Sequence, residues 1–337
     1  MKKTFFAVLA IVLFSSHTMF LKLDSYFLEP NTPVSLQLFN GTFDNSENVI
    51  DRNRMLDASI LSNGMRTRVT DSQWTEKDSI TILNFQTGEA GTYVAGVSTK
   101  ARSLEMSADD FNDYLEHEGI YDMLEWRKNN NALEAKAVEK YSKHVKSIFQ
   151  VGDTKTHDWQ TALGYPIEFI PLNNPYALHT GDSLEVKLLF KGKPLANQLV
   201  YADYKGSKNA HSHDGGTSHS HEVDGNKQLH THTSGQKLRT DAEGIAKANL
   251  SSDGIWYFQT INLVNTEEEE EDGLTHESNW ATLTFQVTHS HGEDTHTHKN
   301  EHGHNTDYKI YIFLIGSFLL IGILFLWFNR KSNTRES

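Results

Sequence analysis

The 337-residue sequence predicts a mainly β protein: two β-sandwich (immunoglobulin-like) units with a helical insertion, plus one C-terminal transmembrane helix. Short apolar runs are interrupted by turn residues about every ten positions, as in a β-sandwich. A single stretch changes from two-residue to 3.6-residue periodicity, which indicates helix. One long apolar run without charges lies close to the C-terminus, and its length suits a membrane span.

The first 16 residues have the pattern of a secretory signal peptide. Lys2 and Lys3 precede an apolar run from Phe5 to Phe14, and Ser15 and Ser16 supply small residues for cleavage. This order of charge, short apolar stretch and small residues is typical of an exported protein. An uncleaved anchor is the alternative, although the run is short for a span. Residues 1–16 are therefore predicted to be a signal peptide.

Residues 17–103 are predicted to form the first β unit. Apolar and polar residues alternate at 20–23 and 35–39, which indicates strands with one buried face. The runs 80–85 and 91–98 repeat this signal, with glycines between them for a tight connection.

A helical segment is predicted at 104–150. Ser107 is a favourable N-cap for a first helix and is followed by acids in the first turn. A second helix is predicted from Asn131 to Phe149, because apolar residues recur there on one face; they are Leu133, Ala137, Tyr141, Val145 and Ile148. His117 and His144 fall in these helices and are interpreted as ordinary packed or solvated residues.

Residues 158–288 are predicted to form the second β unit. Apolar residues at 184, 186 and 188 alternate with charged ones, and further strands are predicted at 198–204, 254–263 and 280–287. A histidine-rich loop at 211–232 interrupts this unit. Glu267 to Asp272 is a run of acids, interpreted as a solvated loop. Weak cation binding by these acids is the alternative.

The C-terminal region is predicted to cross a membrane once. Residues 289–306 lack any apolar run and are predicted to be a histidine-rich tether. The transmembrane helix is predicted at 309–328, about the length that spans a hydrocarbon core of about 30 Å. Basic residues in the tail 329–337 place that tail in the cytoplasm by the positive-inside rule. The bulk of the chain is then extracytoplasmic, in the periplasm.

Composition excludes several classes of function. The formal net charge of −13 argues against nucleic acid as a partner. The sequence has no cysteine, which excludes disulfides, thiolate metal sites and cysteine nucleophiles. It contains no Gly-x-Ser-x-Gly, His-Glu-x-x-His or phosphate-loop motif. The protein is therefore predicted not to be an enzyme.

Two histidine tracts carry the chemistry of this sequence. Twelve of the 18 histidines form six His-x-His pairs in these tracts. In an extended chain, side chains at i and i+2 point the same way, so two imidazoles can converge on one ion. The predicted metal ligands are His211, His213, His219, His221, His230, His232, His289, His291, His296, His298, His302 and His304.

His17 is a separate candidate ligand, because cleavage before it would create a chelate of its amine and imidazole; an ordinary residue after the cleavage site is the alternative. Imidazole suits nickel, cobalt, zinc and copper, whereas calcium and magnesium prefer oxygen. The predicted cofactor is thus a divalent transition metal of one of these four kinds. The alternative interpretation of the tracts is a low-complexity linker whose histidines bind no metal.

A further pattern consists of the segments Leu163-Gly-Tyr-Pro-Ile-Glu-Phe-Ile-Pro-Leu, Gly192-Lys-Pro-Leu-Ala-Asn, Leu238-Arg-Thr-Asp-x-x-Gly, Gly254-Ile-Trp-Tyr and Glu277-Ser-Asn-Trp-Ala-Thr-Leu. These segments resemble the NikM-like family, a bacterial periplasmic family associated with cobalt/nickel ABC transport. The resemblance covers nearly the whole exported part, and it implies a β-rich protein associated with nickel or cobalt uptake. Position 18 departs from the family, where an acid often follows the first histidine; here it is Thr18.

The sequence as a whole predicts a membrane-anchored, extracytoplasmic transition-metal-binding accessory protein. Its expected partners are the membrane and a metal-transporter permease. The alternative is a surface immunoglobulin-like adhesion or scaffolding module without a metal role.

Overall fold

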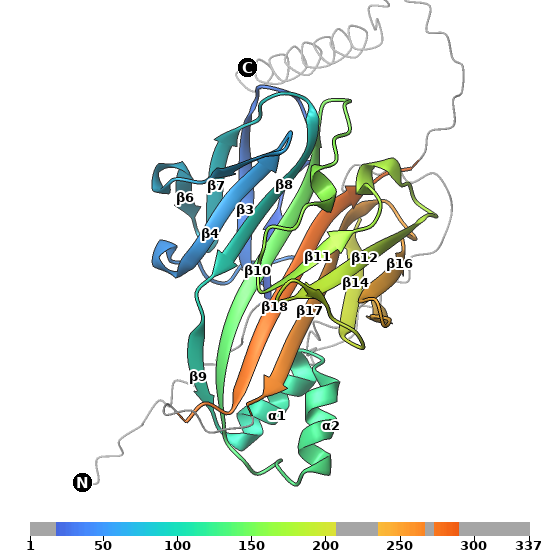
Figure 1. Ribbon diagram of the computed structural model, residues 1–337. Helices are drawn as coiled ribbons and strands as arrows, with labels where there is room; N and C mark the ends of the chain where they lie inside the picture. The colour runs from blue at the N-terminus through green and yellow to red at the C-terminus, as the bar shows by residue number, and fades with distance from the viewer. Residues whose placement is uncertain (1–17, 207–234, 267–272, 290–337) are drawn as a thin grey trace, which may run out of the picture. The chain divides into compact units, whose positions relative to one another are not determined.

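The computed structural model describes residues 18–206, 235–266 and 273–289 (Figure 1). These residues form three β-sheets and two α-helices, so the predicted mainly β fold class is confirmed. The predicted signal peptide, acidic run, membrane helix and tail lie outside the described residues, as do both histidine tracts except His289. Over the described ranges, no helix is long and apolar enough to cross a membrane.

The largest sheet has ten strands and runs through the middle of the fold. Its main order is β15-β14-β17-β18-β10-β8-β4-β5, and β2 and β9 also pair with β10. The strands are β2 (Phe27–Leu28), β4 (Met55–Ser62), β5 (Met65–Arg68), β8 (Gly91–Thr99), β9 (Arg102–Met106), β10 (Ala137–Val151), β14 (Leu199–Lys205), β15 (Gln236–Arg239), β17 (Gly254–Asn265) and β18 (His276–Val287).

Strands β10 and β18 run parallel and join the two halves of the chain. Their register extends from Glu139 opposite His276 to Ser147 opposite Thr284. On one side of this pair lie strands from the first predicted β unit, and on the other lie strands from the second (Figure 1). The two predicted units therefore share one sheet. Their immunoglobulin-like topology stays a prediction.

Two four-stranded sheets accompany the central one. The first has the order β1-β3-β7-β6; in the second, β11-β12-β13 are joined by β16, which pairs with β12. Their bounds are β1 (Thr18–Lys22), β3 (Pro33–Gly41), β6 (Trp74–Lys77), β7 (Ile80–Gln86), β11 (Ile167–Pro171), β12 (Ser183–Phe190), β13 (Lys193–Pro194) and β16 (Ile245–Asn249).

These two sheets cover opposite faces of β10 and β18. On one face, Thr282 Oγ1 of β18 donates to the carbonyl of Met19 in β1, at 2.8 Å. On the other, Lys146 Nζ of β10 donates to the carbonyl of Phe169 in β11, at 3.0 Å. Because successive side chains of a strand alternate between faces, both faces of β10 meet a neighbouring sheet. The main hydrophobic core fills the space between these layers.

Two short α-helices cover one end of the central sheet. Helix α1 (Ala108–His117) begins as predicted, because Ser107 Oγ accepts a hydrogen bond from the Asp110 N–H. Helix α2 (Tyr121–Asn129) follows directly. Their apolar residues, Phe111 and Met123 among them, pack against Trp280 of β18 in a second core cluster. Short 3-10 turns lie at Arg52–Arg54, Asp71–Gln73, Asp158–Gln160 and Pro175–Ala177.

The predicted second helix from Asn131 to Phe149 is wrong. Residues Ala137–Val151 form β10, so only the first part of the predicted helical segment 104–150 is helical. The physical reason is burial on both faces, since every residue from Ser142 to Val151 is buried. A strand covered on both faces shows no two-residue alternation, and periodicity alone cannot separate it from a buried helix.

The other strands predicted from the sequence are confirmed. The segments predicted at 20–23, 35–39, 80–85 and 91–98 correspond to β1, β3, β7 and β8. In the second half, β12, β14, β17 and β18 lie where alternation predicted strands.

Candidate functional site

The structure describes one of the thirteen predicted metal ligands, His289. The other twelve lie outside the described residues: His17, His211, His213, His219, His221, His230, His232, His291, His296, His298, His302 and His304. In the described part of the chain, no group of three or more His, Cys, Asp or Glu side chains could hold a metal ion.

His289 follows strand β18 and is oriented by a carboxylate. Its Nδ1 contacts Asp253 Oδ2, while 67% of its side chain remains exposed. The other oxygen of Asp253 accepts a hydrogen bond from the Thr180 hydroxyl. Burial raises the pKa of Asp253, but the hydrogen bonds from Thr180 and His289 outweigh burial and hold this pKa below its usual value. Asp253 therefore stays ionised, keeps the proton of His289 on Nδ1 and leaves Nε2 as the electron-pair donor.

The two segments that contain the histidine tracts start from the same edge of the fold. The first leaves the described chain just after Lys205 and Gly206, and the second leaves after His289. Lys205 pairs with Ile255 of β17, and Ile255 pairs with Gln286 of β18. Neighbouring strands lie about 4.8 Å apart, so Lys205 and Gln286 are separated by only about 10 Å.

Gly254 lies at the start of β17, the strand between these two starting points. Its φ is 145°, and a Cβ at this position would lie 2.2 Å from the carbonyl oxygen of Lys205. Its neighbour Asp253 contacts His289. We call Lys205, Asp253, Gly254 and His289 the tract root. The sequence alone could not predict this arrangement, because Asp253 and His289 are 36 positions apart.

A second candidate site is an open cavity of about 620 Å³ beside β10, here called the β10 groove. Ser142, His144 and Asn279 contribute to its buried floor. Its apolar walls include Leu56, Tyr165 and Leu189, and Lys100 and Lys191 lie exposed on its rim. A volume of this size suits a small molecule, because ligand pockets usually measure about 300–1,000 Å³.

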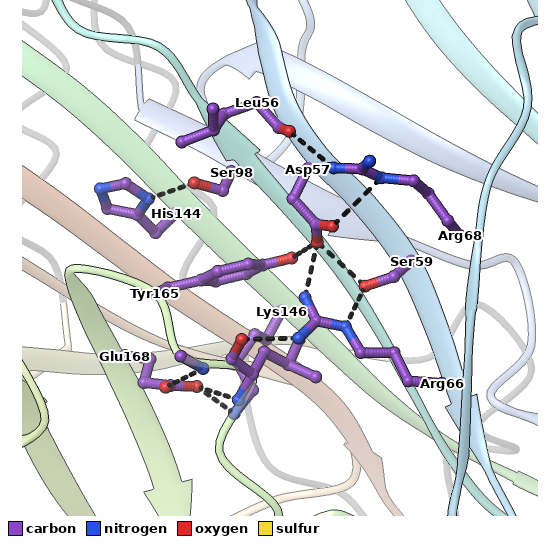
Figure 2. Close-up of polar contacts among 12 residues, drawn as sticks. Leu56, Asp57, Ser59, Arg66, Arg68, Ser98, His144, Lys146, Tyr165 and Glu168 are labelled. Carbon is purple, nitrogen blue, oxygen red and sulfur yellow. Dashed lines mark hydrogen bonds and ion pairs between the residues drawn. The ribbon is translucent and has the colours of Figure 1, made fainter.

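Hydrogen bonds fix the imidazole of His144 on both sides. Ser98 Oγ lies 2.9 Å from Nδ1, a contact drawn as a dashed line in Figure 2, and Ser142 Oγ lies 3.0 Å from Nε2. Ser142 Oγ donates onward to Asn279 Oδ1 at 3.1 Å. Ser142 therefore accepts from Nε2–H, and Nδ1 accepts from Ser98. Burial lowers the pKa of His144 to about 4, so the ring is neutral near pH 7.

A polar network holds the wall residue Tyr165 in place (Figure 2). Its hydroxyl donates to Asp57 Oδ2 at 2.8 Å, and Arg66 Nη2 donates to the same oxygen at 2.8 Å. Arg66 also donates to the carbonyl of Leu163 at 2.7 Å. The network ties the loop before β11 to strands β4 and β5. The Tyr165 ring is therefore a preformed wall of the groove.

A buried ion pair lies beneath the same loop. Lys146 Nζ is 3.1 Å from Glu168 Oε2, and the two side chains are 1% and 2% exposed. Glu168 also accepts hydrogen bonds of 2.9 Å from the backbone N–H groups of Leu163 and Gly164. Burial lowers the pKa of Lys146, against the opposing effect of Glu168. The pair thus anchors the groove wall to the central strand.

His144 is packed, which is one of the two alternatives predicted for it, but it lies on strand β10 instead of a helix and also lines the groove. Ser98 and His144 come from strands that are neighbours in space but not in sequence. Only the pairing of β8 with β10 brings them together. No motif in the sequence indicates that pairing.

The chain belongs to the family described as Domain of unknown function (DUF4198), whose model matches residues 14–263. This description names neither a metal nor a transport role. No curated protein matches the sequence.

Solved structures match with low structural similarity. A mutant of Salmonella alpha-2-macroglobulin is 11% identical, with 80% of this chain and 15% of that chain covered, at a TM-score of 0.21. This chain therefore spans 15% of the length of that protein. The D0-D1 domain of intimin is 12% identical, with 79% and 96% covered, at a TM-score of 0.18. A marsupial T cell receptor is 9% identical, with 80% and 96% covered, at 0.19.

Proposed function

We propose that this protein is a membrane-anchored, extracytoplasmic accessory protein that captures a divalent transition metal for uptake. The observation that carries this proposal is the set of six His-x-His pairs in two segments that start from one tract root. Adaptable chelating tracts suit capture and delivery better than catalysis. Nickel or cobalt is the proposed cargo, in line with the NikM-like resemblance, and zinc and copper are the alternatives.

The position of the tract root favours metal ions that take ligands from both tracts. Six positions separate Lys205 from His211, and an extended chain of that length reaches about 20 Å. That reach exceeds the separation of about 10 Å between the two starting strands. Ligands from both tracts can therefore meet at one ion. A four-coordinate ion needs about two His-x-His pairs, so six pairs supply about three ions.

A membrane anchor would keep the captured metal close to the membrane. The apolar run at 310–328 follows the second tract closely, so an inserted helix would hold the chelating segments close to the membrane surface. The proposed partner there is a metal-transporter permease.

Metal titration of the full-length protein tests this function. We expect about three ions of nickel, cobalt, zinc or copper to bind at pH 7.5, because two pairs serve each ion. A variant with all twelve tract histidines changed to alanine should lose this binding. Binding should also fade below about pH 6.5, since only neutral imidazole coordinates a metal. Calorimetry with each metal provides the measurement. Equal uptake by wild type and variant would remove the tracts from the mechanism, and no uptake by either would contradict the proposed function.

The carboxylate of Asp253 should strengthen the metal ligand His289. Changing a carboxylate that orients a metal-bound histidine typically weakens binding by about 10-fold or more. We therefore expect Asp253→Asn to weaken the tightest metal site by about 10-fold without changing the number of ions bound. Asp182→Asn is the matched control, because Asp182 bonds the backbone N–H of His179 rather than an imidazole. Equal weakening by both variants would indicate general loss of negative charge instead of orientation.

A further inference from the structure

We propose that the β10 groove is a binding site for a small organic monocarboxylate with an apolar body. This inference does not depend on the metal function. It rests on the shape of the groove, its preformed polar floor and the charges on its rim.

The floor is polar although it lies in the interior. Ser142 and His144 are 9% and 2% exposed, and Asn279 is 3% exposed. Buried polar groups cost folding free energy, and apolar replacements of similar shape are often neutral or stabilising. Here the groups form a chain of hydrogen bonds from Ser98 through His144 and Ser142 to Asn279. A hydrogen-bonded floor at the base of a cavity is the arrangement expected of a ligand site.

The walls are apolar and rigid. Tyr165 is held through Asp57 and Arg66, and its ring centroid lies 6.0 Å from that of His144. Leu56, although 55% exposed, lines the same groove. An exposed leucine beside a fixed aromatic ring offers apolar area that a ligand body would remove from water.

The rim selects the charge of the ligand. Lys100 follows β8 and Lys191 lies in the turn between β12 and β13, so the two cations come from different elements. Within the described residues, neither lysine forms an ion pair, whereas Lys146 and Glu168 compensate each other. The remaining carboxylate of the groove is Glu277, which accepts a hydrogen bond from Asn279 Nδ2 at 3.2 Å. Because the groove has two such lysines and one remaining carboxylate, its net charge favours an anionic ligand.

These features fit a ligand with one carboxylate and a compact apolar body. The carboxylate would sit near Lys100 and Lys191, and the body would lie against Leu56 and Tyr165. The floor would then hydrogen-bond to a polar substituent or an ordered water. A cationic ligand would meet two positive charges at the rim, Lys100 and Lys191, and its own charge would lack compensation there.

Benzoate is the probe, and benzamide and benzylamine are its neutral and cationic counterparts. Binding to full-length protein in lipid nanodiscs is measured by saturation-transfer NMR and calorimetry. Metal is absent, and the variant lacking the twelve tract histidines serves as host, so failure here is distinct from failure of the metal function. We expect benzoate to bind more tightly than both counterparts.

Three variants locate the site. Ala162→Trp places a large ring in the groove at an exposed lining position and should abolish benzoate binding. Lys100→Ala and Lys191→Ala should each weaken binding by about two- to five-fold, the usual range for an exposed charge pair. The control Lys193→Ala, an exposed lysine of β13 outside the groove lining, should leave binding unchanged. Equal binding of all three probes, undiminished binding to Ala162→Trp, or no binding of benzoate would each overturn the proposal.

Discussion

Changing Lys146 to methionine is expected to lower the free energy of unfolding by about 3–5 kcal/mol, the usual cost of removing one partner from a buried ion pair. Lys146 and Glu168 are almost fully buried and lie 3.1 Å apart. Without the lysine, the Glu168 carboxylate keeps its hydrogen bonds to Leu163 and Gly164 but loses its counter-charge. Urea unfolding followed by tryptophan fluorescence measures the change.

Two further variants separate charge from packing. Lys140→Met changes an exposed lysine of the same strand and should alter stability by less than about 0.5 kcal/mol, as surface substitutions usually do. Adding Glu168→Gln to Lys146→Met should restore part of the loss, because no charge then remains buried, although the amide oxygen replaces only one of the two carboxylate oxygens that accept from backbone N–H groups. If the double variant is less stable than Lys146→Met, the loss comes from packing and not from an unpaired charge.

How much of the fold the sequence predicts depends on how many faces of an element are covered. One face of strand β12 is partly open to solvent, so Leu184, Val186 and Leu188 alternate with half-buried neighbours. That alternation predicted it correctly. Strand β10 lies between two sheets, and its polar residues Lys143 and Lys146 face inward. Its pattern therefore resembled a helix.

The candidate sites also differ in how far the sequence alone predicts them. The His-x-His pairs are local in sequence, so they could be recognised without a structure. The tract root depends on Gly254 lying against Lys205, and the β10 groove depends on Ser98 lying beside His144. Such juxtapositions come from strand order, which no short motif specifies.

The second large effect concerns Glu118, a buried acid that caps the C-terminal end of helix α1. Glu118 is 2% exposed, and its Oε2 has no hydrogen-bond partner within the described residues. Burial raises its pKa from 4.5 to about 8, with a smaller opposing effect of Lys143 and a further increase from Glu139. The neighbouring Glu139 also has its pKa raised by burial, to about 7. Both acids are therefore protonated in the folded protein at pH values where the unfolded chain has lost these protons.

The sign of the pH dependence follows from this difference in bound protons. Between about pH 4.5 and pH 7–8 the folded state binds more protons, so Glu118 makes stability fall as pH rises. Each unit of pH in this window costs about 1.4 kcal/mol, or about 2–3 kcal/mol between pH 5 and pH 7. His144 and His276 oppose this trend, because burial lowers each pKa to about 4. Lys143, whose pKa burial lowers to about 7, adds stability mainly above pH 7.

A comparison of wild type with Glu118→Gln isolates the acid from these other groups, which titrate in both proteins. We expect the glutamine variant to gain about 2–3 kcal/mol relative to wild type between pH 5 and pH 7. Urea unfolding at half-unit pH steps gives the two curves. The control is Glu116→Gln, which changes an exposed residue of helix α1. Its free energy of unfolding should depend on pH as that of wild type does. If the stability of Glu118→Gln shows the same pH dependence as wild type, the folded protein ionises Glu118 without cost. The carboxylate then has a compensating partner at neutral pH, such as Lys143, whose charge lowers the pKa of Glu118.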